Sequence, residues 1–187
     1  MFHYQSKLYP ALSIACALGF VLIVAWLQHI QPGYNPYHQL MSELYFGHQG
    51  ETMHIAFCLL ALSVAALGVA LAGQHVWQML LGPIFIASLC FLAIGAIQID
   101  WAKSTHLTLI GVALICSLMS MVLLPHSLSR PILRYPRTIS WSAGALMLAS
   151  SVQGILPTGL GIRLTVGALL IWVCCISIQL LLRKPEA

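Results

Sequence analysis

The sequence predicts an all-α, polytopic membrane protein, a bundle of six transmembrane helices with short connectors and both termini in the cytoplasm. Sixty per cent of the 187 residues are hydrophobic, only 6% are charged, and the mean hydropathy is +0.92. Six stretches almost free of charge approach the ~20 residues that a helix needs to cross a bilayer. This composition excludes an ordinary soluble domain, in which about 25% of residues are charged, a disordered chain and a nucleic-acid-binding protein with a basic patch.

The first three predicted spans are residues 10–30, 52–71 and 76–98. They are helices because backbone groups in lipid must be hydrogen-bonded within the segment. The first span is longer than the apolar part of a signal peptide and ends in Gln28-His29-Ile30 instead of small residues, so it is a retained helix. Pro32-Gly33 ends the first span, and Ala72-Gly73 ends the second.

The last three predicted spans are residues 105–124, 138–156 and 162–182. A proline-rich connector from Pro125 to Pro136 precedes the fifth span, and Pro157-Thr158-Gly159 follows it. The fifth span is rich in Ser, Ala and Gly, which allow close helix approach in lipid. We expect it in the middle of the bundle or at the contact of a homo-oligomer. The six cysteines all fall inside spans and are interpreted as packing residues. The chain is thus one transmembrane domain, residues 1–187.

The basic residues predict the orientation, since cytoplasmic connectors of membrane proteins are enriched in Lys and Arg. The predicted inner face holds Lys7, Arg130, Arg134, Arg137, Arg183 and Lys184. The predicted outer face holds Lys103 and Arg163. This asymmetry favours both termini in the cytoplasm and a bacterial inner membrane, with membrane lipids as partners of the basic residues.

Residues 31–50 form the longest connector and are predicted to be an outer loop or lid. Its tyrosines and Phe46 suit the membrane interface, where amphipathic aromatic rings concentrate. A connector of this length without periodicity is often a lid or a binding segment. We expect it to lie over the mouth of the bundle, with a short interfacial helix near residues 39–46.

Most groups able to do chemistry gather at the predicted outer face. Glu43 lies in the loop, and His54 lies one turn into the second span. Asp100 ends the third span, His106 opens the fourth, and Arg163 opens the sixth. Ionisable groups in membrane helices are costly and often functional. We therefore predict a pocket lined by these five residues that binds a polar or amphipathic ligand, such as a lipid head group, without a cofactor.

Arg163 stands at a helix N-terminus, where the helix dipole favours anions and gives a cation no stabilisation. It therefore needs a partner, either Asp100 or Glu43 within the protein or the phosphate of a lipid, each of which a guanidinium can bind with two hydrogen bonds. We prefer the internal ion pair, which would join the third and sixth helices.

The alternative is a membrane enzyme or redox protein that uses the same cluster. His48, Glu51 and His54 are candidate ligands for a divalent metal, although their spacing is not the H-E-x-x-H of zinc proteases. His54 and His106 could ligate a b-type haem across the bundle. Ser42 with a histidine and an acid offers the residue types of a hydrolase, without a nucleophile motif. A transporter is less favoured because no span carries a deep charge.

Several short motifs carry a resemblance to a known family. They are Pro32-Gly33-Tyr34-Asn35-Pro36, Met41-Ser42-Glu43-Leu44, Asp100, His106 and Gly159-Leu160-Gly161-Ile162-Arg163-Leu164. In these motifs the chain resembles the DUF998 family of bacterial and archaeal membrane proteins over nearly its whole length. The resemblance implies a six-span fold and a site at the outer face. It implies no reaction, because the family has no agreed activity.

Overall fold

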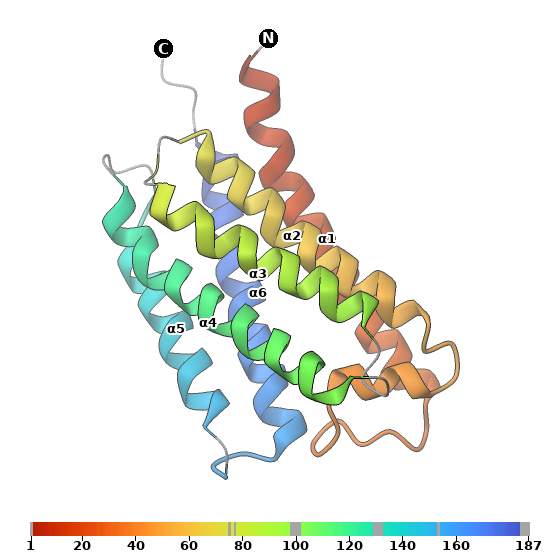
Figure 1. Ribbon diagram of the computed structural model, residues 1–187. Coiled ribbons are helices and arrows are strands. Elements are labelled where there is room, and N and C mark those ends of the chain that lie inside the picture. Colours follow the sequence, from red (N-terminus) through yellow and green to blue (C-terminus); the bar gives the residue numbers. More distant parts are fainter. Residues whose placement is uncertain are drawn as a thin grey trace.

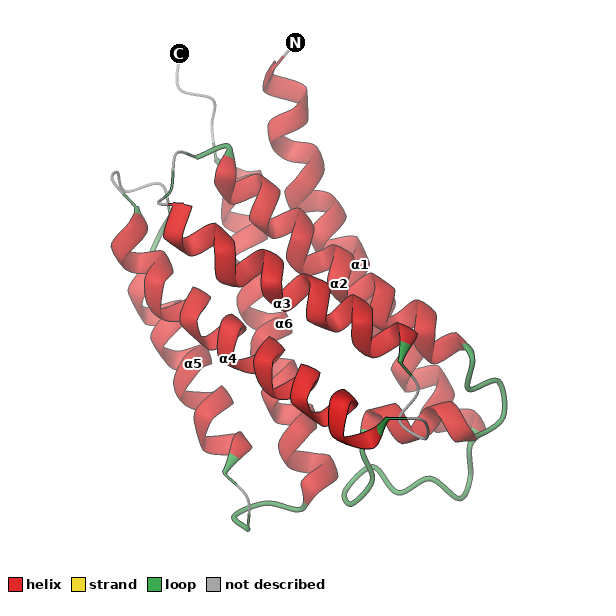
Figure 2. Cartoon of the chain, in the orientation of Figure 1, coloured by secondary structure: helices red, strands yellow, loops and turns green. Residues whose placement is uncertain are grey.

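The computed structural model describes residues 2–74, 76, 78–97, 102–128, 133–152 and 154–183. Their helices are, in order, α1 (Phe2–Ile30), the 3-10 helix η1 (Met41–Phe46), α2 (Thr52–Ala72), α3 (Gln78–Ala96), α4 (Lys103–Ser127), α5 (Pro136–Ser151) and α6 (Thr158–Leu182). Within these residues there is no strand (Figure 2). The predicted all-α fold is confirmed.

Five of these helices, α1, α2, α3, α4 and α6, are long and apolar enough to cross a membrane. Helix α5 has 16 residues, which is short of the ~20 that a full crossing requires. The chain is therefore a polytopic helical membrane protein with five candidate spans among its described residues. The sixth span and the cytoplasmic location of the termini stay predictions.

The helices form a closed ring. Each helix packs against the next in the sequence, α6 packs back on α1, and α2 also touches α6 across the ring (Figure 1). Neighbouring helices run antiparallel, as short connectors require. The N-terminal end of α1 and the C-terminal end of α6 lie together. We call the opposite end, where residues 31–51, Ile97, Ala102 and residues 154–157 lie, the loop end.

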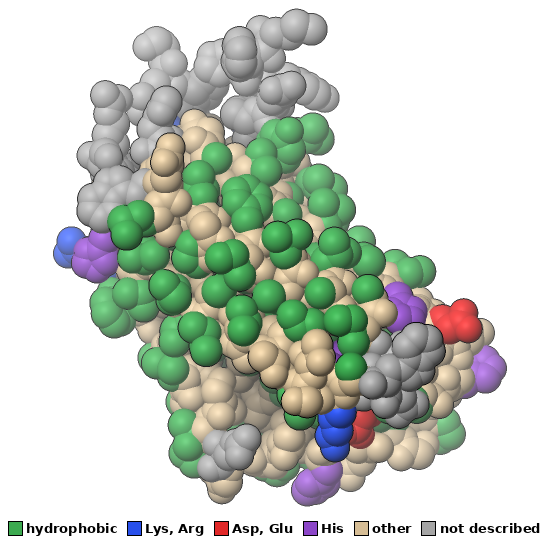
Figure 3. Space-filling view, in the orientation of Figure 1, with side chains coloured by type: hydrophobic (Ala, Val, Ile, Leu, Met, Phe, Trp, Pro, Cys, Tyr) green, Lys and Arg blue, Asp and Glu red, His purple; other side chains and the backbone are tan. Residues whose placement is uncertain are grey.

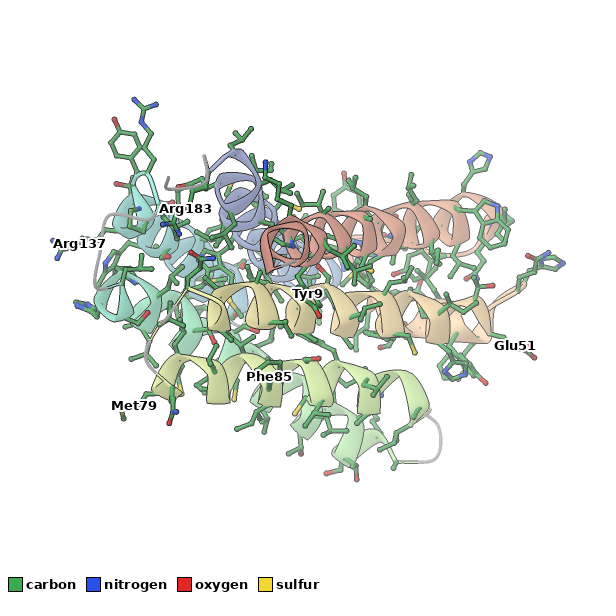
Figure 4. The ribbon with its side chains drawn as sticks, turned by 90° about the horizontal axis from the view of Figure 1, so that it is seen from above. Tyr9, Glu51, Met79, Phe85, Arg137 and Arg183 are labelled. Carbon is green, nitrogen blue, oxygen red and sulfur yellow. The ribbon has the colours of Figure 1, made fainter. Side chains whose placement is uncertain are left out.

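The surface matches a protein surrounded by lipid. Hydrophobic side chains cover the middle of the face in Figure 3, and charged residues and histidines stand towards its ends. Large apolar side chains such as Leu22, Leu89 and Ile115 are more than half exposed. Arg137 and Arg183 lie at one end of the bundle and Glu51 at the other (Figure 4). The bilayer is the solvent that suits such an apolar belt.

Small polar residues join the helices inside the apolar region. The Ser13 hydroxyl on α1 donates to the Ser63 carbonyl on α2, and the Ser63 hydroxyl donates back to the Ser13 carbonyl, both at 2.8 Å. The buried Trp172 indole of α6 donates to the Ser140 hydroxyl of α5 at 3.0 Å. Such hydrogen bonds between helices replace the hydrophobic driving force that is missing in lipid. At least part of the small-residue face of α5 thus serves packing within this chain.

Helix α1 begins at Phe2, eight residues before the predicted start of the first span, and α5 stops at Ser151 and not near residue 156. Val152 has an extended conformation, and Gly154 has a φ of +90°, a value that glycine adopts easily and other residues rarely do. The apolar Ile155 and Leu156 extended the predicted helix beyond this turn. The early end leaves the loop-end parts of α4 and α6 without a helix between them.

Candidate functional site

Two of the predicted site residues, His54 on α2 and His106 on α4, meet at the C-terminal end of α3. His54 Nδ1 donates to the Gly95 carbonyl, and His106 Nδ1 donates to the Ile97 carbonyl at 3.0 Å. The last carbonyls of a helix lack partners within it, and side-chain N–H groups can hydrogen-bond to them. Both histidines therefore cap the same helix, one from each side.

This capping fixes which ring nitrogen carries the proton. A carbonyl oxygen can only accept a hydrogen bond, so Nδ1 holds the hydrogen on both rings, and in the neutral ring Nε2 carries a lone pair. His106 is only 2% exposed, and its Nε2 is buried without a hydrogen-bond partner among the residues that the structure describes. A buried polar atom without a partner costs free energy. The atom is therefore available to a small polar group that enters beside it.

The two histidines line one small cavity of about 20 Å³. Ser42 and Tyr45 of η1 line it too, with Met53, Phe57, Ile94, Gly95 and Ile97. The Tyr45 ring packs edge-on against the His54 ring, with 4.9 Å between centroids. A cavity of this size holds about one water molecule or one group of similar size. We call it the histidine cavity.

Arg163 is placed elsewhere at the loop end and binds backbone. Its Nη1 donates to the carbonyls of Pro36 at 2.6 Å, Gln39 at 3.0 Å and Gly159 at 2.8 Å, and its Nη2 donates to the Tyr34 hydroxyl. Among the described residues it forms no ion pair with Glu43. The alternative partner, Asp100, lies outside the described residues. Arg163 thus fastens residues 34–39 onto the start of α6.

The glycine one turn earlier completes this attachment. A Cβ at Gly159 would stand 2.5 Å from both the Pro36 and the Gln39 carbonyl oxygens, closer than any side chain tolerates. The Leu160 amide donates to the Tyr37 carbonyl at 3.1 Å, which satisfies one of the free amides of the helix start. The Gly159-x-x-x-Arg163 spacing therefore forms a clamp, in which Gly159 admits the loop backbone and Arg163 binds its carbonyls.

Tyr34 is the loop side of this clamp. Its hydroxyl accepts from Arg163 and donates to the Leu40 carbonyl at 2.9 Å, and the guanidinium carbon lies 5.4 Å from the ring centroid. Burial raises the pKa of the Tyr34 hydroxyl above its usual value, and the hydrogen bond from Arg163 offsets part of that rise. The phenol therefore stays protonated and able to donate at neutral pH.

Glu43 does not line the histidine cavity. It is half-buried on η1 and borders a separate surface groove of about 320 Å³, together with Gln31, Tyr34 and His48. His48 and Glu51, the other candidate metal ligands, are exposed. In the described part of the chain, no three His, Cys, Asp or Glu residues are grouped so that they could hold a metal ion.

A larger hollow at the loop end lies between α4, α5 and α6, and the sequence did not predict it. This groove has a volume of about 520 Å³ and is lined by Leu107, Ile110 and Leu114 of α4, Ser150 and Ser151 of α5, Gly161, Ile162 and Thr165 of α6, and Leu40, Val152, Gly154, Leu156 and Thr158. Its volume is within the range of small-molecule sites, roughly 300–1,000 Å³. We call it the lateral groove.

Hydroxyl groups line the lateral groove where α5 meets α6. Thr165 Oγ1 lies 2.8 Å from Ser150 Oγ and 3.1 Å from Ser151 Oγ. A Cβ at Gly161 would stand 2.8 Å from the Ser150 carbonyl oxygen, so the two helices touch there. The small residues that predicted close packing therefore also create the groove, because they leave the space on its inner side unfilled.

A third, apolar cavity of about 30 Å³ shares lining residues with each of the other two. It shares Leu40, Ile110, Leu114 and Ile162 with the lateral groove. It shares Ser42, Phe57 and Ile94 with the histidine cavity. The apolar cavity thus lies between the lateral groove and the histidine cavity.

Comparison with known proteins identifies one family. The family described as "Protein of unknown function (DUF998)" matches residues 14–179. This match includes the loop, both histidines and the clamp. Neither the curated proteins nor the solved structures contain a match to the chain.

Proposed function

The chain belongs to the DUF998 family of proteins of unknown function, and we propose that this integral membrane protein binds an amphipathic ligand at its loop end. The polar end of the ligand would lie at the histidine cavity and its apolar part in the lateral groove. The observation that carries the proposal is the unpartnered Nε2 of the buried His106. A lipid is the ligand class that reaches such a site directly, because two of the three helices that line the groove, α4 and α6, are candidate membrane spans.

The orientation follows from the same reasoning. The end opposite the loop end carries Arg137 and Arg183 and Arg134, whose backbone amide donates to Gln179 near the end of α6, and cationic residues favour the cytoplasmic side. We propose a bacterial inner membrane with the histidine cavity near the outer surface. The ligand would then come from the outer leaflet.

Filling the lateral groove is expected to displace the ligand. In Ser151→Phe, a ring would occupy the groove from an exposed position on α5. Overpacking of this kind costs about 1–3 kcal/mol, which corresponds to a loss of about tenfold or more in affinity. Native mass spectrometry of the protein in mild detergent measures the fraction of chains that carry a co-purified lipid.

Ser142→Phe is the matched control for this measurement. Ser142 is also exposed on α5, and its hydroxyl donates to the Thr138 carbonyl four residues earlier, as that of Ser151 does to Met147. Ser142 does not line the groove. Equal lipid occupancy in both variants, or no bound lipid in the unmodified protein, would contradict the proposed function.

A second candidate function, an enzyme or redox protein with a metal, is favoured by one observation. Histidines that bind metals commonly donate their other ring nitrogen to a carbonyl, as His54 and His106 do. The histidine cavity suits a single ion and not a porphyrin. Elemental analysis decides this candidate. About one zinc, copper or iron per chain, lost in a His106→Asn variant, would favour it over lipid binding.

A further inference from the structure

The polar end of the proposed site has a defined hydrogen-bonding character. In both histidines, Nδ1 donates its hydrogen to a backbone carbonyl at the C-terminal end of α3. What the neutral rings offer to a ligand is therefore an acceptor at Nε2. Among described residues, no Lys or Arg lines the histidine cavity, the apolar cavity or the lateral groove. The site thus accepts hydrogen bonds and holds no fixed positive charge.

Arg163 is the cation that the sequence placed in this pocket, and both of its Nη groups already donate to groups within the protein. Arg163 Nη1 donates to three backbone carbonyls and Nη2 donates to Tyr34. Its Nε has no partner among the described residues but is buried, so a lipid phosphate would have to displace those contacts to reach the guanidinium. The histidine cavity also lies at the C-terminal end of α3, where the helix dipole presents its negative end. An anionic head group would therefore meet lone pairs and a negative dipole.

Ser42 supplies the complementary contact. Its side chain is 6% exposed and lines both the histidine cavity and the apolar cavity beside it. A hydroxyl can donate one hydrogen bond and accept others. A ligand group that donates to His106 Nε2 can accept from Ser42 in return. A hydroxyl group has both capacities, and the histidine cavity of about 20 Å³ is large enough for it.

We propose that the ligand is a lipid alcohol, whose hydroxyl donates to His106 Nε2 and accepts from Ser42, with its hydrocarbon body in the lateral groove. This inference rests on the proposed function and specifies its ligand class. The groove lies between α5 and two candidate membrane spans, α4 and α6. A lipid with an uncharged head can therefore enter sideways without carrying a charge through the membrane interior, which would be costly.

The test compares three photoreactive probes that differ only in the head group: a diazirine-labelled hexadecanol, the hexadecanoic acid and the hexadecyl phosphate. The protein is placed in phosphatidylcholine nanodiscs at neutral pH, and intact-mass spectrometry measures the labelled fraction. We expect saturable labelling by the alcohol, and about tenfold weaker labelling by the acid and the phosphate.

The variant His106→Asn isolates the role of Nε2. The Asn amide can replace Nδ1 as the donor to the Ile97 carbonyl but lacks the distal nitrogen. Loss of one buried hydrogen bond is expected to weaken labelling by the alcohol about tenfold. Ser42→Ala is a second variant that leaves the capping of α3 intact and should weaken labelling in the same direction. His38→Asn, at an exposed histidine of the loop, is the control and should label normally.

Two results would overturn the lipid-alcohol inference. They differ in whether the proposed function also fails. If the acid or the phosphate labels as well as the alcohol and Ser151→Phe still abolishes labelling, the site binds lipids of another class and the proposed function stands. If no probe labels in a saturable way and Ser151→Phe changes nothing, both the lipid-alcohol site and the proposed function are wrong.

Discussion

Replacing Arg163 with Ala should lower the melting temperature of the detergent-solubilised protein more than any other single side-chain truncation at the loop end. The guanidinium donates to three backbone carbonyls and to Tyr34. Hydrogen bonds from charged groups contribute about 1.5–3 kcal/mol each, and buried acceptors without donors add a further penalty. Because the Arg163 residue is only half-buried, we expect a net loss of about 3 kcal/mol in the free energy of unfolding.

Two further variants define the cause. Arg137→Ala removes an exposed cation at the opposite end and should leave the melting temperature nearly unchanged, as exposed charges contribute little. Arg163→Lys keeps the charge but loses the fork of donors, so it should behave almost like Arg163→Ala. If Arg163→Lys melts like the unmodified protein, charge alone is sufficient, and the clamp described above is wrong.

The helices were predictable because the membrane imposes one simple requirement. A segment in lipid has to be long, apolar and helical, and α1, α2, α3, α4 and α6 are all recognised in this way. Helix α5 was placed correctly but extended too far. Its end depends on the backbone turn at Val152 and Gly154, whereas the apolar residues that follow continue the hydrophobic pattern.

The candidate site was predictable only in part. His54 and His106, which the sequence placed at one depth, line the same cavity. The helix dipole argument correctly required a partner for Arg163, but the partners are mainly backbone carbonyls of residues 36, 39 and 159. Every residue has a carbonyl, so residue types carry no sign of such a contact. An acid was therefore the partner that the sequence could suggest.

The lateral groove lay beyond any prediction from residue types. A void is produced by what neighbouring helices fail to fill, and Ser150, Gly161 and Thr165 are equally compatible with tight packing throughout. In the structure they bring α5 and α6 together but leave α4 apart from α6. The same small residues are therefore compatible with close packing and with a groove. Which of these forms depends on how α4, α5 and α6 are arranged.

The clamp and the candidate site depend on each other. Arg163 and Gly159 hold the backbone of residues 36 and 39. The next residues along the chain, from Leu40 to Ser42, form walls of all three hollows. Weakening the clamp should therefore disturb the ligand site as well as the stability, although neither clamp residue lines the histidine cavity.

The variant Gly159→Ala tests this dependence with the smallest possible change. The added methyl group would stand 2.5 Å from two backbone oxygens and 2.9 Å from the Gln39 nitrogen, none of which can rotate away as a side chain can. Overpacking costs about 1–3 kcal/mol, and we expect the upper part of that range because the loop backbone has to move. Faster cleavage by chymotrypsin after Tyr34 or Tyr37 would show that the loop has separated from α6.

The same substitution at Gly167 provides a control with the opposite sign. Nothing lies within 4 Å of a Cβ added there, and Ala is favoured over Gly inside a helix by up to ~1 kcal/mol. Gly167→Ala should therefore raise the melting temperature slightly and leave the rate of loop cleavage unchanged. If Gly159→Ala were stabilising as well, helix propensity would outweigh the contact with the loop. The close approach of residues 36 and 39 to α6 would then contribute nothing to the attachment of the loop.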